Sequence, residues 1–381
     1  MSTAELRQPD RITSRESLGA ARRIVVKIGS SSLTDARGRL DEHRVRSIAD
    51  VAAHLAGCGT ELVIVSSGAI AAALGPLGLA ERPSSVELQQ AAASVGQALL
   101  AGAWSSALGA HDLITGQVLL TESDVIRPET YRNVRSALEA LLGMGAVPVV
   151  NENDTTATHE IRFGDNDRLA ALVAQLLGAD ALFLLTDVDA LYTAPPKEPG
   201  AQRISRVDDV ARLAGVSIGS VGSKVGTGGM VTKLSAAQLA VTTGTAALMT
   251  TPEHLAAALE GGDVGTFFPA HHGRRRSQLV WLRFATRGAG TLRLDEGAAE
   301  AVRSRRRSLL AVGVTEVSGT FPAGVPVDVA APDGAVIARG IASFSSDELR
   351  AMAGRGTEEA RDTLGERFRR PAIHRDQLVM L

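Results

Sequence analysis

Cysteine is almost absent from this chain of 381 residues, in which Cys58 is the single thiol. One cysteine excludes an internal disulfide, and this composition fits the reducing cytosol. The eight histidines show no ligand-like spacing, and the neighbours His271 and His272 cannot easily share one ion. The sequence therefore predicts neither a disulfide framework nor a metal centre built from cysteine and histidine side chains.

Neither sign of charge is in marked excess. The 40 Lys and Arg oppose 42 Asp and Glu, and a net charge of -2 argues against general affinity for nucleic acids or membranes. Residues 1–20 mix both signs and lack the apolar core of a signal peptide, so we interpret them as a flexible tail. The uncharged run 62–80 is nearly long enough to span a bilayer, but its serines, glycines and proline favour a strand, a turn and a short helix. These features predict a cytoplasmic protein that does not contact membranes.

Lysine is also scarce, and the four that occur among the 40 basic residues are Lys27, Lys197, Lys224 and Lys233. A preference for arginine codons explains the low number. Against that background each lysine is informative, because a compact ammonium provides a point charge where a planar guanidinium would not fit. Three of the four lie within a few residues of a glycine turn, whereas Lys197 lies in a proline-rich stretch typical of a solvent loop.

The P-loop pattern is absent, because no Gly-Lys pair occurs anywhere in the chain. Yet residues 225–233, VGTGGMVTK, combine three glycines with a lysine. Backbone N–H groups at glycine turns and helix N-termini bind anions. One interpretation is a dinucleotide-binding oxidoreductase, but no G-x-G-x-x-G motif follows the first expected strand. The other is a phosphotransferase that holds ATP without a Walker loop.

Short β-rich segments alternate with helical patterns along the first 250 residues. The expected strands are 23–29, 61–68, 114–120, 146–154, 181–189 and 246–251. The expected helices are 43–56, 85–108, 129–142, 166–177 and 230–242. Several strands are apolar throughout, as in strands buried on both faces of a parallel sheet. The alternation predicts an α/β three-layer sandwich with a mainly parallel sheet, whose ligands bind beyond the carboxyl ends of the strands.

The composition changes near residue 286. Beyond it, short alternating segments are separated by Gly, Pro and Asp turns, which predicts a small β-rich domain of its own. The expected division is a tail at 1–20, a catalytic domain at 21–285 and a β-rich domain at 286–370.

Polar residues follow the expected strands at five places. They are Lys27 with Gly29 and three serines, Ser67-Gly68, Asn151 to Asp154, Thr186-Asp187, and the glycine loop before Lys233. Each of these places, taken alone, has an ordinary structural explanation. The strand lysine can be an edge residue that snorkels to solvent, Ser67-Gly68 can be a turn, and Thr186-Asp187 can cap a helix. The segment 162–180 is a stronger indication of function, because Asp165 and Asp167 flank Asn166 at the start of a helix where one N-capping residue would suffice. The conjunction of all five along one α/β pattern favours a function.

Six segments together resemble the amino acid kinase family, and in particular its members that phosphorylate glutamate. They are VVKIGSSSLT, VIVSSGAIAAAL, VPVVNENDT, GDNDRLAALVA, LLTDVDALYT and GTGGMVTKL, and the set NEND, GDND and GTGGM-x-T-K is specific. Residues 287–367 resemble a PUA domain. The resemblance implies ATP and Mg²⁺ as cofactors, L-glutamate as substrate, and proline biosynthesis as the pathway.

The resemblance also implies roles for individual residues. Lys27 would contact the transferring phosphate, Lys233 would lie on its other side, and Asp167 would organise the two lysines. The positions that match glutamate binding are Ser67, Asp154 and Asn166. The positions that match nucleotide binding are Lys27, Thr186, Asp187, Ser223, Lys224, Val225, Gly226, Thr227, Gly228, Gly229 and Met230. Lys224 replaces what is often an uncharged residue, and the resemblance gives it no role of its own.

The chemistry of such a transfer agrees with these residues. The side-chain carboxylate of glutamate has a pKa of about 4.3, so it is an anion at neutral pH and needs no general base. The difficulty is to bring it to a triphosphate, which calls for Mg²⁺, lysines and backbone N–H groups. Asp167 is then an orienting residue rather than a base.

Partners are implied by the resemblance alone. It implies feedback inhibition by proline and assembly as a homo-oligomer. RNA binding by the PUA-like domain is not favoured, because aromatic residues make up 3% of the chain and the arginine clusters 274–276 and 303–307 suit solvated surface. The alternative function is a non-catalytic amino-acid-sensing or RNA-binding protein on a kinase scaffold, against which the intact lysine pair and GDND argue.

Overall fold

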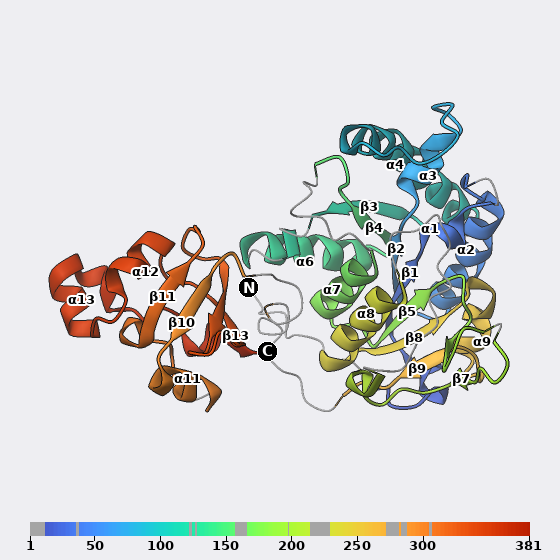
Figure 1. Cartoon of the computed structure of the whole chain (residues 1–381). Helices are drawn as coiled ribbons and strands as arrows, with labels where there is room; N and C mark the ends of the chain where they lie inside the picture. The colour runs from blue at the N-terminus through green and yellow to red at the C-terminus, as the bar shows by residue number, and fades with distance from the viewer. Residues whose placement is uncertain are drawn as a thin grey trace. The chain divides into compact units, whose positions relative to one another are not determined.

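The computed structural model describes residues 12–35, 38–121, 124–125, 128–156, 166–196, 198–213, 229–271, 282, 288–304 and 307–381. The chain divides into two compact units, Met1–Arg274 and Arg275–Leu381 (Figure 1). No helix within the described ranges combines the length and the apolar content that a membrane crossing needs. The uncharged run 62–80 instead contains a buried strand and a short helix.

A seven-stranded sheet forms the centre of the described part of the first unit. Its strands, in spatial order, are β3 (Thr115–Leu120), β4 (Val147–Glu152), β2 (Glu61–Ser66), β1 (Arg23–Ile28), β5 (Ala181–Leu185), β8 (Ala246–Thr250) and β9 (Thr266–Phe268). In this sheet β9 is antiparallel to β8 and the other pairings are parallel. The predicted mainly parallel sheet is therefore confirmed, and each expected strand is present. The expected strands 61–68 and 181–189 were too long, because their last polar residues form loops.

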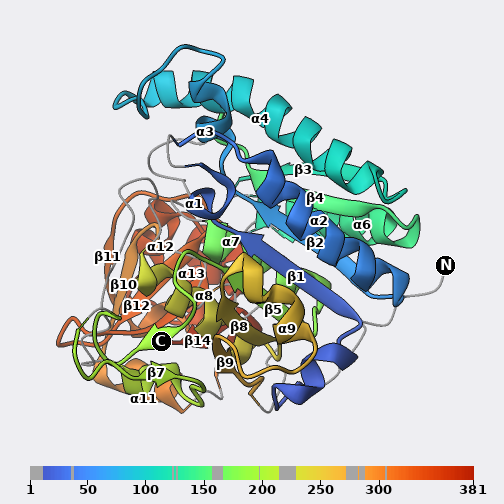
Figure 2. The ribbon, with the colours of Figure 1, turned by 90° about the vertical axis from the view of Figure 1, so that its right-hand side faces the viewer.

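Helices cover both faces of the sheet (Figures 1 and 2). One face carries α6 (Pro128–Gly143), α7 (Asn166–Leu177) and α8 (Met230–Thr242). The other carries α2 (Glu42–Gly57), α4 (Val86–Gly109) and α9 (Leu255–Leu259), which share one core with the strands. The five expected helices agree with α2, α4, α6, α7 and α8 to within one residue at each end. The short α1 (Ser30–Leu33) and α3 (Ala69–Leu74) follow β1 and β2.

Side chains along each strand alternate between these two faces. Val26 and Ile28 lie in the core that contains α2 and α4, so Lys27 between them points to the face that carries α7. By the same alternation, Ser66 of β2 and Asn151 of β4 point to the α4 face. The carboxyl edge of the sheet thus receives polar side chains from both layers.

The amino-terminal segment differs from the expected flexible tail in the part that the structure describes. Residues 12–20 include a short 3₁₀ helix, Glu16–Ala20. Ile12 and Leu18 are buried in the core of the first unit, and Arg15 donates a hydrogen bond of 2.6 Å to the carbonyl oxygen of Ser205. The mixed charge of the segment concealed these two apolar contacts, which hold it against the fold.

The second unit contains a five-stranded sheet within the described residues. The strands, in spatial order, are β11 (Val314–Ser318), β10 (Thr291–Leu294), β12 (Pro326–Ala330), β13 (Val336–Ile341) and β14 (Leu378–Met380). Helices in the described part of this unit include α11 (Glu296–Arg303), α12 (Ser346–Met352) and α13 (Thr357–Leu364). The unit has its own core, which includes Leu292, Val327 and Phe344. This confirms a separate β-rich sheet, which extends past residue 370 because β14 pairs with β13.

Candidate active site

Two lysines from different layers contact one carboxylate at the carboxyl edge of the sheet. Asp167, the second residue of α7, is fully buried, and Lys27 of β1 forms an ion pair with its Oδ1. Lys233 Nζ lies 3.1 Å from Asp167 Oδ2. Buried charges are costly unless they are paired, so this arrangement is stable only with its partners in place. The three side chains sum to one positive charge, which favours an anion beside them.

The local structure explains why Lys233 reaches this point. Gly229 is the N-cap of α8 and has extended backbone, so Lys233 lies in the first turn of the helix. Thr232 Oγ1 lies 2.7 Å from the carbonyl oxygen of Gly229 and 3.2 Å from Asp167 Oδ2. Thr232 therefore links the start of α8 to α7 beside the lysine pair. It was not among the expected site residues, although it directly precedes Lys233 in the motif.

Asn166, the first residue of α7, binds the ends of two strands. Its Nδ2 donates to the carbonyl oxygen of Ser66 at 3.0 Å and to Ser67 Oγ at 2.9 Å. It also donates to Asn151 Oδ1 at 2.8 Å. Asn166 and Ser67, both expected to bind glutamate, are thus brought together beside Asp167. Asn151 was quoted in a motif but given no role.

The other amide atom of Asn166 is an open acceptor. Asn166 is 9% exposed, and its Oδ1 is buried without a hydrogen-bond partner among the residues that the structure describes. A buried acceptor without a donor costs about 1–3 kcal/mol. The position therefore favours a ligand that brings a hydrogen-bond donor.

Asp154, the third residue expected to bind glutamate, lies in the turn after β4 and is half-buried. Because β4 pairs with β2, this turn lies at the same edge of the sheet as Ser67. Asp154 therefore adds a carboxylate to the region that contains Asn166.

The residues expected to bind the nucleotide lie only partly within the described structure. Thr186 and Asp187 directly follow β5, which pairs with β1, and Thr186 Oγ1 lies 3.0 Å from Asp187 Oδ1. Gly229 and Met230 begin α8. Gly29 follows β1, and a Cβ on it would make an ordinary van der Waals contact of 3.8 Å with Lys27 Nζ. Ser223, Lys224, Val225, Gly226, Thr227 and Gly228 lie outside the described residues.

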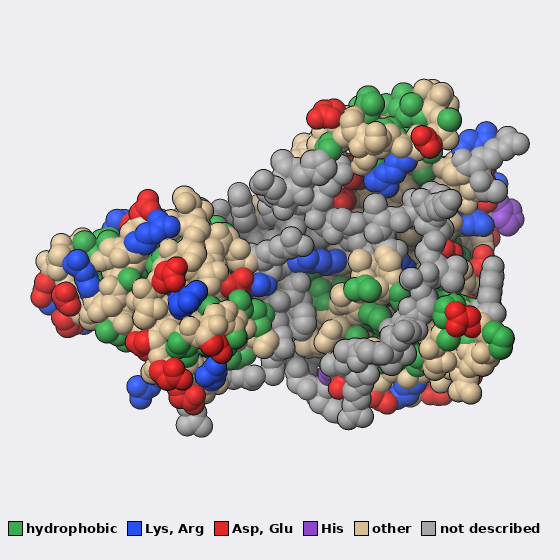
Figure 3. All heavy atoms as spheres, viewed as in Figure 1, with side chains coloured by type: hydrophobic (Ala, Val, Ile, Leu, Met, Phe, Trp, Pro, Cys, Tyr) green, Lys and Arg blue, Asp and Glu red, His purple; other side chains and the backbone are tan. Residues whose placement is uncertain are grey.

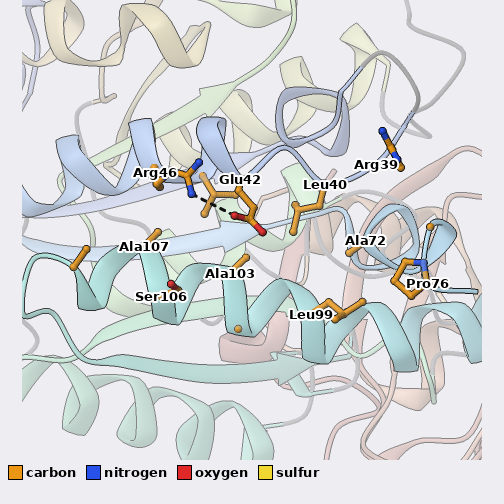
Figure 4. A pocket seen from close by; sticks show the side chains of 14 residues that line it. Arg39, Leu40, Glu42, Arg46, Ala72, Pro76, Leu99, Ala103, Ser106 and Ala107 are labelled. Carbon is orange, nitrogen blue, oxygen red and sulfur yellow. Dashed lines mark hydrogen bonds and ion pairs between the residues drawn. The ribbon is translucent and has the colours of Figure 1, made fainter.

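A separate hollow of about 500 Å³ lies between α2, α3 and α4 (Figure 4). Its lining includes Leu40, Leu99 and Ala103, and along one wall the α2 residues Glu42 and Arg46 form an ion pair of 3.3 Å. No strand end and no predicted site residue lines it. The candidate site is therefore at the carboxyl edge of the sheet, where the titratable groups converge.

Comparison with known proteins agrees with this geometry. Residues 22–249 match the model of the amino acid kinase family, and residues 290–364 match the PUA domain. A glutamate 5-kinase from Salinispora arenicola is 52% identical over 368 residues, which cover 96% of this chain and 100% of the relative. A glutamate 5-kinase from Thermobifida fusca is 50% identical over 369 residues, covering 96% and 95%.

Among solved structures, the carbamate kinase from Giardia lamblia bound to AMP-PNP aligns with a TM-score of 0.48 at 17% identity. The alignment covers 66% of this chain and 100% of that chain. The family models and the near full-length relatives decide the assignment. The chain therefore belongs to the amino acid kinase family, in its glutamate 5-kinase branch, and carries a PUA domain after the kinase fold.

Proposed function

We propose that the protein transfers the γ-phosphoryl group of ATP to the side-chain carboxylate of L-glutamate, the first step of proline biosynthesis. The observation that carries this proposal is the Asp167 carboxylate with a buried lysine at each oxygen. The near full-length similarity to glutamate 5-kinases supports the same reaction. The product is L-glutamyl 5-phosphate, an acyl phosphate.

The reaction brings one anion to another. A carboxylate oxygen of glutamate attacks the γ-phosphorus, the bond from that phosphorus to the β–γ bridging oxygen breaks, and ADP leaves with the electron pair. No proton moves, because the attacking carboxylate is already ionised. Lys27 and Lys233 stabilise the charge on the phosphoryl group as it passes between the two oxygens, and Asp167 keeps both ammonium groups in place.

The two substrates approach from two sides of this lysine pair. Ser67, Asp154 and Asn166 bind glutamate, and Asn166 Oδ1 accepts a hydrogen bond from it. At neutral pH the α-ammonium is the donor that glutamate offers. Thr186, Asp187 and the start of α8 bind the nucleotide. Positioning two reactants in this way makes the transfer an effectively unimolecular step.

Mg²⁺ fits this site as an ion that arrives with ATP. Such ions keep several waters and use one or two carboxylates together with substrate phosphates. The Asp167 carboxylate is engaged by two lysines, while Asp187 presents an exposed carboxylate after β5. When bound, Mg²⁺ neutralises part of the charge of the phosphates.

A homo-oligomer is supported by helix α4. Between Leu88 and Ala110 the sequence has no charged residue, yet Leu88, Val95 and Leu99 are 59%, 41% and 42% exposed. Residues 88, 95 and 99 lie at i, i+7 and i+11 and so share one face of α4, and a second copy of the same uncharged face would cover them. Val95→Glu should therefore dissociate the oligomer, as measured by light scattering. An unchanged mass would contradict this face.

Two further parts of the proposal concern regulation and place. Proline would lower activity by competing with glutamate, since both are amino acids. The glutamate KM should then rise with proline concentration.

The reaction would take place in the cytoplasm. RNA binding by the PUA domain is not favoured, because basic and acidic side chains are intermixed on the face of the second unit that Figure 3 shows.

The experiment that tests the function is an ADP-release assay with glutamate, aspartate, N-acetylglutamate and UMP as acceptors. We expect release with glutamate alone, and trapping of the acyl phosphate as a hydroxamate. Turnover with UMP alone would contradict the proposal. A protein that binds glutamate or proline without ADP release would instead favour a non-catalytic sensor.

A further inference from the structure

Helix α4 contacts the glutamate side of the site at three places. A Cβ on Gly96 would lie 1.7 Å from the carbonyl oxygen of Ala69, so the backbone of α4 touches the start of α3, two residues after Ser67. Trp104 Nε1 donates a hydrogen bond of 2.9 Å to Ser66 Oγ. Gln97 Oε1 accepts a hydrogen bond of 2.7 Å from Asn151 Nδ2. No residue of α4 was expected in the site.

Backbone groups determine how the amides in this region are oriented. The N–H of Glu152 can only donate, and it donates to Asn151 Oδ1 at 2.8 Å. Asn151 Nδ2 must therefore point the other way, toward Gln97 Oε1. Asn151 is 2% exposed, so its N–H group needs an acceptor from the protein, and Gln97 supplies it.

Asn166 is oriented by the same relay. The carbonyl oxygen of Ser66 can only accept, so the atom of Asn166 beside it is Nδ2. Asn151 Oδ1 is the second acceptor for that group. With Nδ2 held by both, Oδ1 of Asn166 is the atom left to face a ligand. The chain of contacts runs from Gln97 through Asn151 to Asn166.

We propose that Gln97 is a positioning residue for the amino acid substrate, which it serves by holding the Asn151 amide and through it Asn166. The inference rests on the proposed function, because the substrate is glutamate. Gln97 acts as an acceptor, and its role is to keep Asn166 Oδ1 directed at the α-ammonium. It takes no part in nucleotide binding.

The first test replaces Gln97 by a side chain of similar size without an acceptor. Gln97→Leu leaves the buried N–H of Asn151 without a partner, and the glutamate KM should rise about tenfold, the scale of one such loss. The KM for ATP should stay within about twofold of the wild type, because Thr186, Asp187 and the start of α8 make no hydrogen bond to this relay within the described structure. Steady-state kinetics with each substrate varied in turn measure both values.

Two variants separate this role from general damage to α4. Gln97→Glu keeps an acceptor for Asn151, so its glutamate KM should lie close to the wild-type value. Gln89→Leu is the matched control, because Gln89 lies on the same helix and its Nε2 donates to the carbonyl oxygen of Pro83 at 2.8 Å, away from the relay. Its glutamate KM should remain at the wild-type value.

A double-mutant cycle with Asn151→Ala completes the test. If Gln97 acts through Asn151, Gln97→Leu should raise the glutamate KM no further in the Asn151→Ala background. The inference is overturned if Gln97→Leu raises the glutamate KM equally in both backgrounds. It is also overturned if the wild type is active and Gln97→Leu leaves the glutamate KM unchanged. A wild-type protein without glutamate turnover contradicts the proposed function instead.

Discussion

Lys233 Nζ lies 3.1 Å from Asp167 Oδ2, although 66 residues separate the two in the chain. Both side chains are buried, and each lies in the first turn of its helix, α8 and α7. The contact therefore joins the starts of two neighbouring helices at the carboxyl edge of the sheet. The position of the Lys233 ammonium group therefore depends on how α7 packs against α8.

The first prediction concerns Lys233 itself. Lys233→Ala should lower kcat and kcat/KM together by about 10²–10³, the usual cost of losing one preorganised group in a transition state. The KM for ATP should change less, because the proposed nucleotide-binding residues Thr186 and Asp187 are unchanged. Lys233→Arg should rescue only in part, since a planar guanidinium replaces a compact ammonium beside Asp167.

Lys224→Ala is the control for this prediction. Lys224 lies outside the described residues, and if it is only surface charge its loss should be nearly silent. Steady-state kinetics on the three variants compare the two lysines directly. A near-normal kcat for Lys233→Ala, with a collapse for Lys224→Ala, would show that the wrong lysine was assigned.

The second prediction concerns Asp154. Asp154→Ala should mainly raise the glutamate KM, because a carboxylate in the turn after β4 contributes to binding of the ground state as well as the transition state. Kinetics with glutamate and ATP varied separately measure this. A raised ATP KM with an unchanged glutamate KM would move Asp154 to the nucleotide side.

The third prediction uses two glycines of α4. Gly96→Ala should destabilise the protein by about 1–3 kcal/mol, because the new Cβ overlaps the backbone of Ala69 and pushes the helices apart. Gly102→Ala meets nothing within 4 Å and should be neutral or stabilise by about 0.5–1 kcal/mol through helix propensity. Urea unfolding compares the two, and equal midpoints would refute the close contact of α4 with α3.

The fourth prediction concerns the two units. Deletion of the residues after about 286 should leave a folded kinase, because each unit has its own core and every predicted site residue lies upstream. Circular dichroism and glutamate-dependent ADP release test this. A folded fragment without activity would show that the second unit is part of the active enzyme.

The fifth prediction concerns acid stability of the second unit. A hydrogen bond from the backbone N–H of Ser345, with the charge of Arg367 nearby, lowers the pKa of Glu348. A lowered folded pKa means that Glu348 stabilises the fold above its unfolded pKa of about 4.3, and that this stability is lost as the pH falls through the folded pKa. Glu348→Gln should therefore be less stable than the wild type at neutral pH, and the difference should shrink on acidification. Calorimetry of the full chain measures it; a constant difference would contradict the role of the charge.

The sequence by itself determined the local structure. Hydrophobic periodicity and turn residues act over a few residues, so α7 and α8 begin and end where their patterns predict. The scarcity of lysine made Lys27 and Lys233 notable before their contacts were known. Composition was less reliable for residues 1–20, because Ile12 and Leu18 are isolated apolar residues in a polar segment, and burial depends on what packs against them.

The tertiary structure alone decided which of these residues meet. Asn166 Nδ2 reaches the carbonyl oxygen of Ser66 across 100 positions of sequence, and Gln97 reaches Asn151 across 54. Parallel strands are joined by long crossovers, so neighbours in such a sheet are distant in the chain. The order β4-β2-β1-β5 places four strand ends side by side, and no local pattern encodes that order. The support of the site by α4 therefore follows from the packing of the whole core, in which an ordinary glutamine becomes the acceptor for a buried amide.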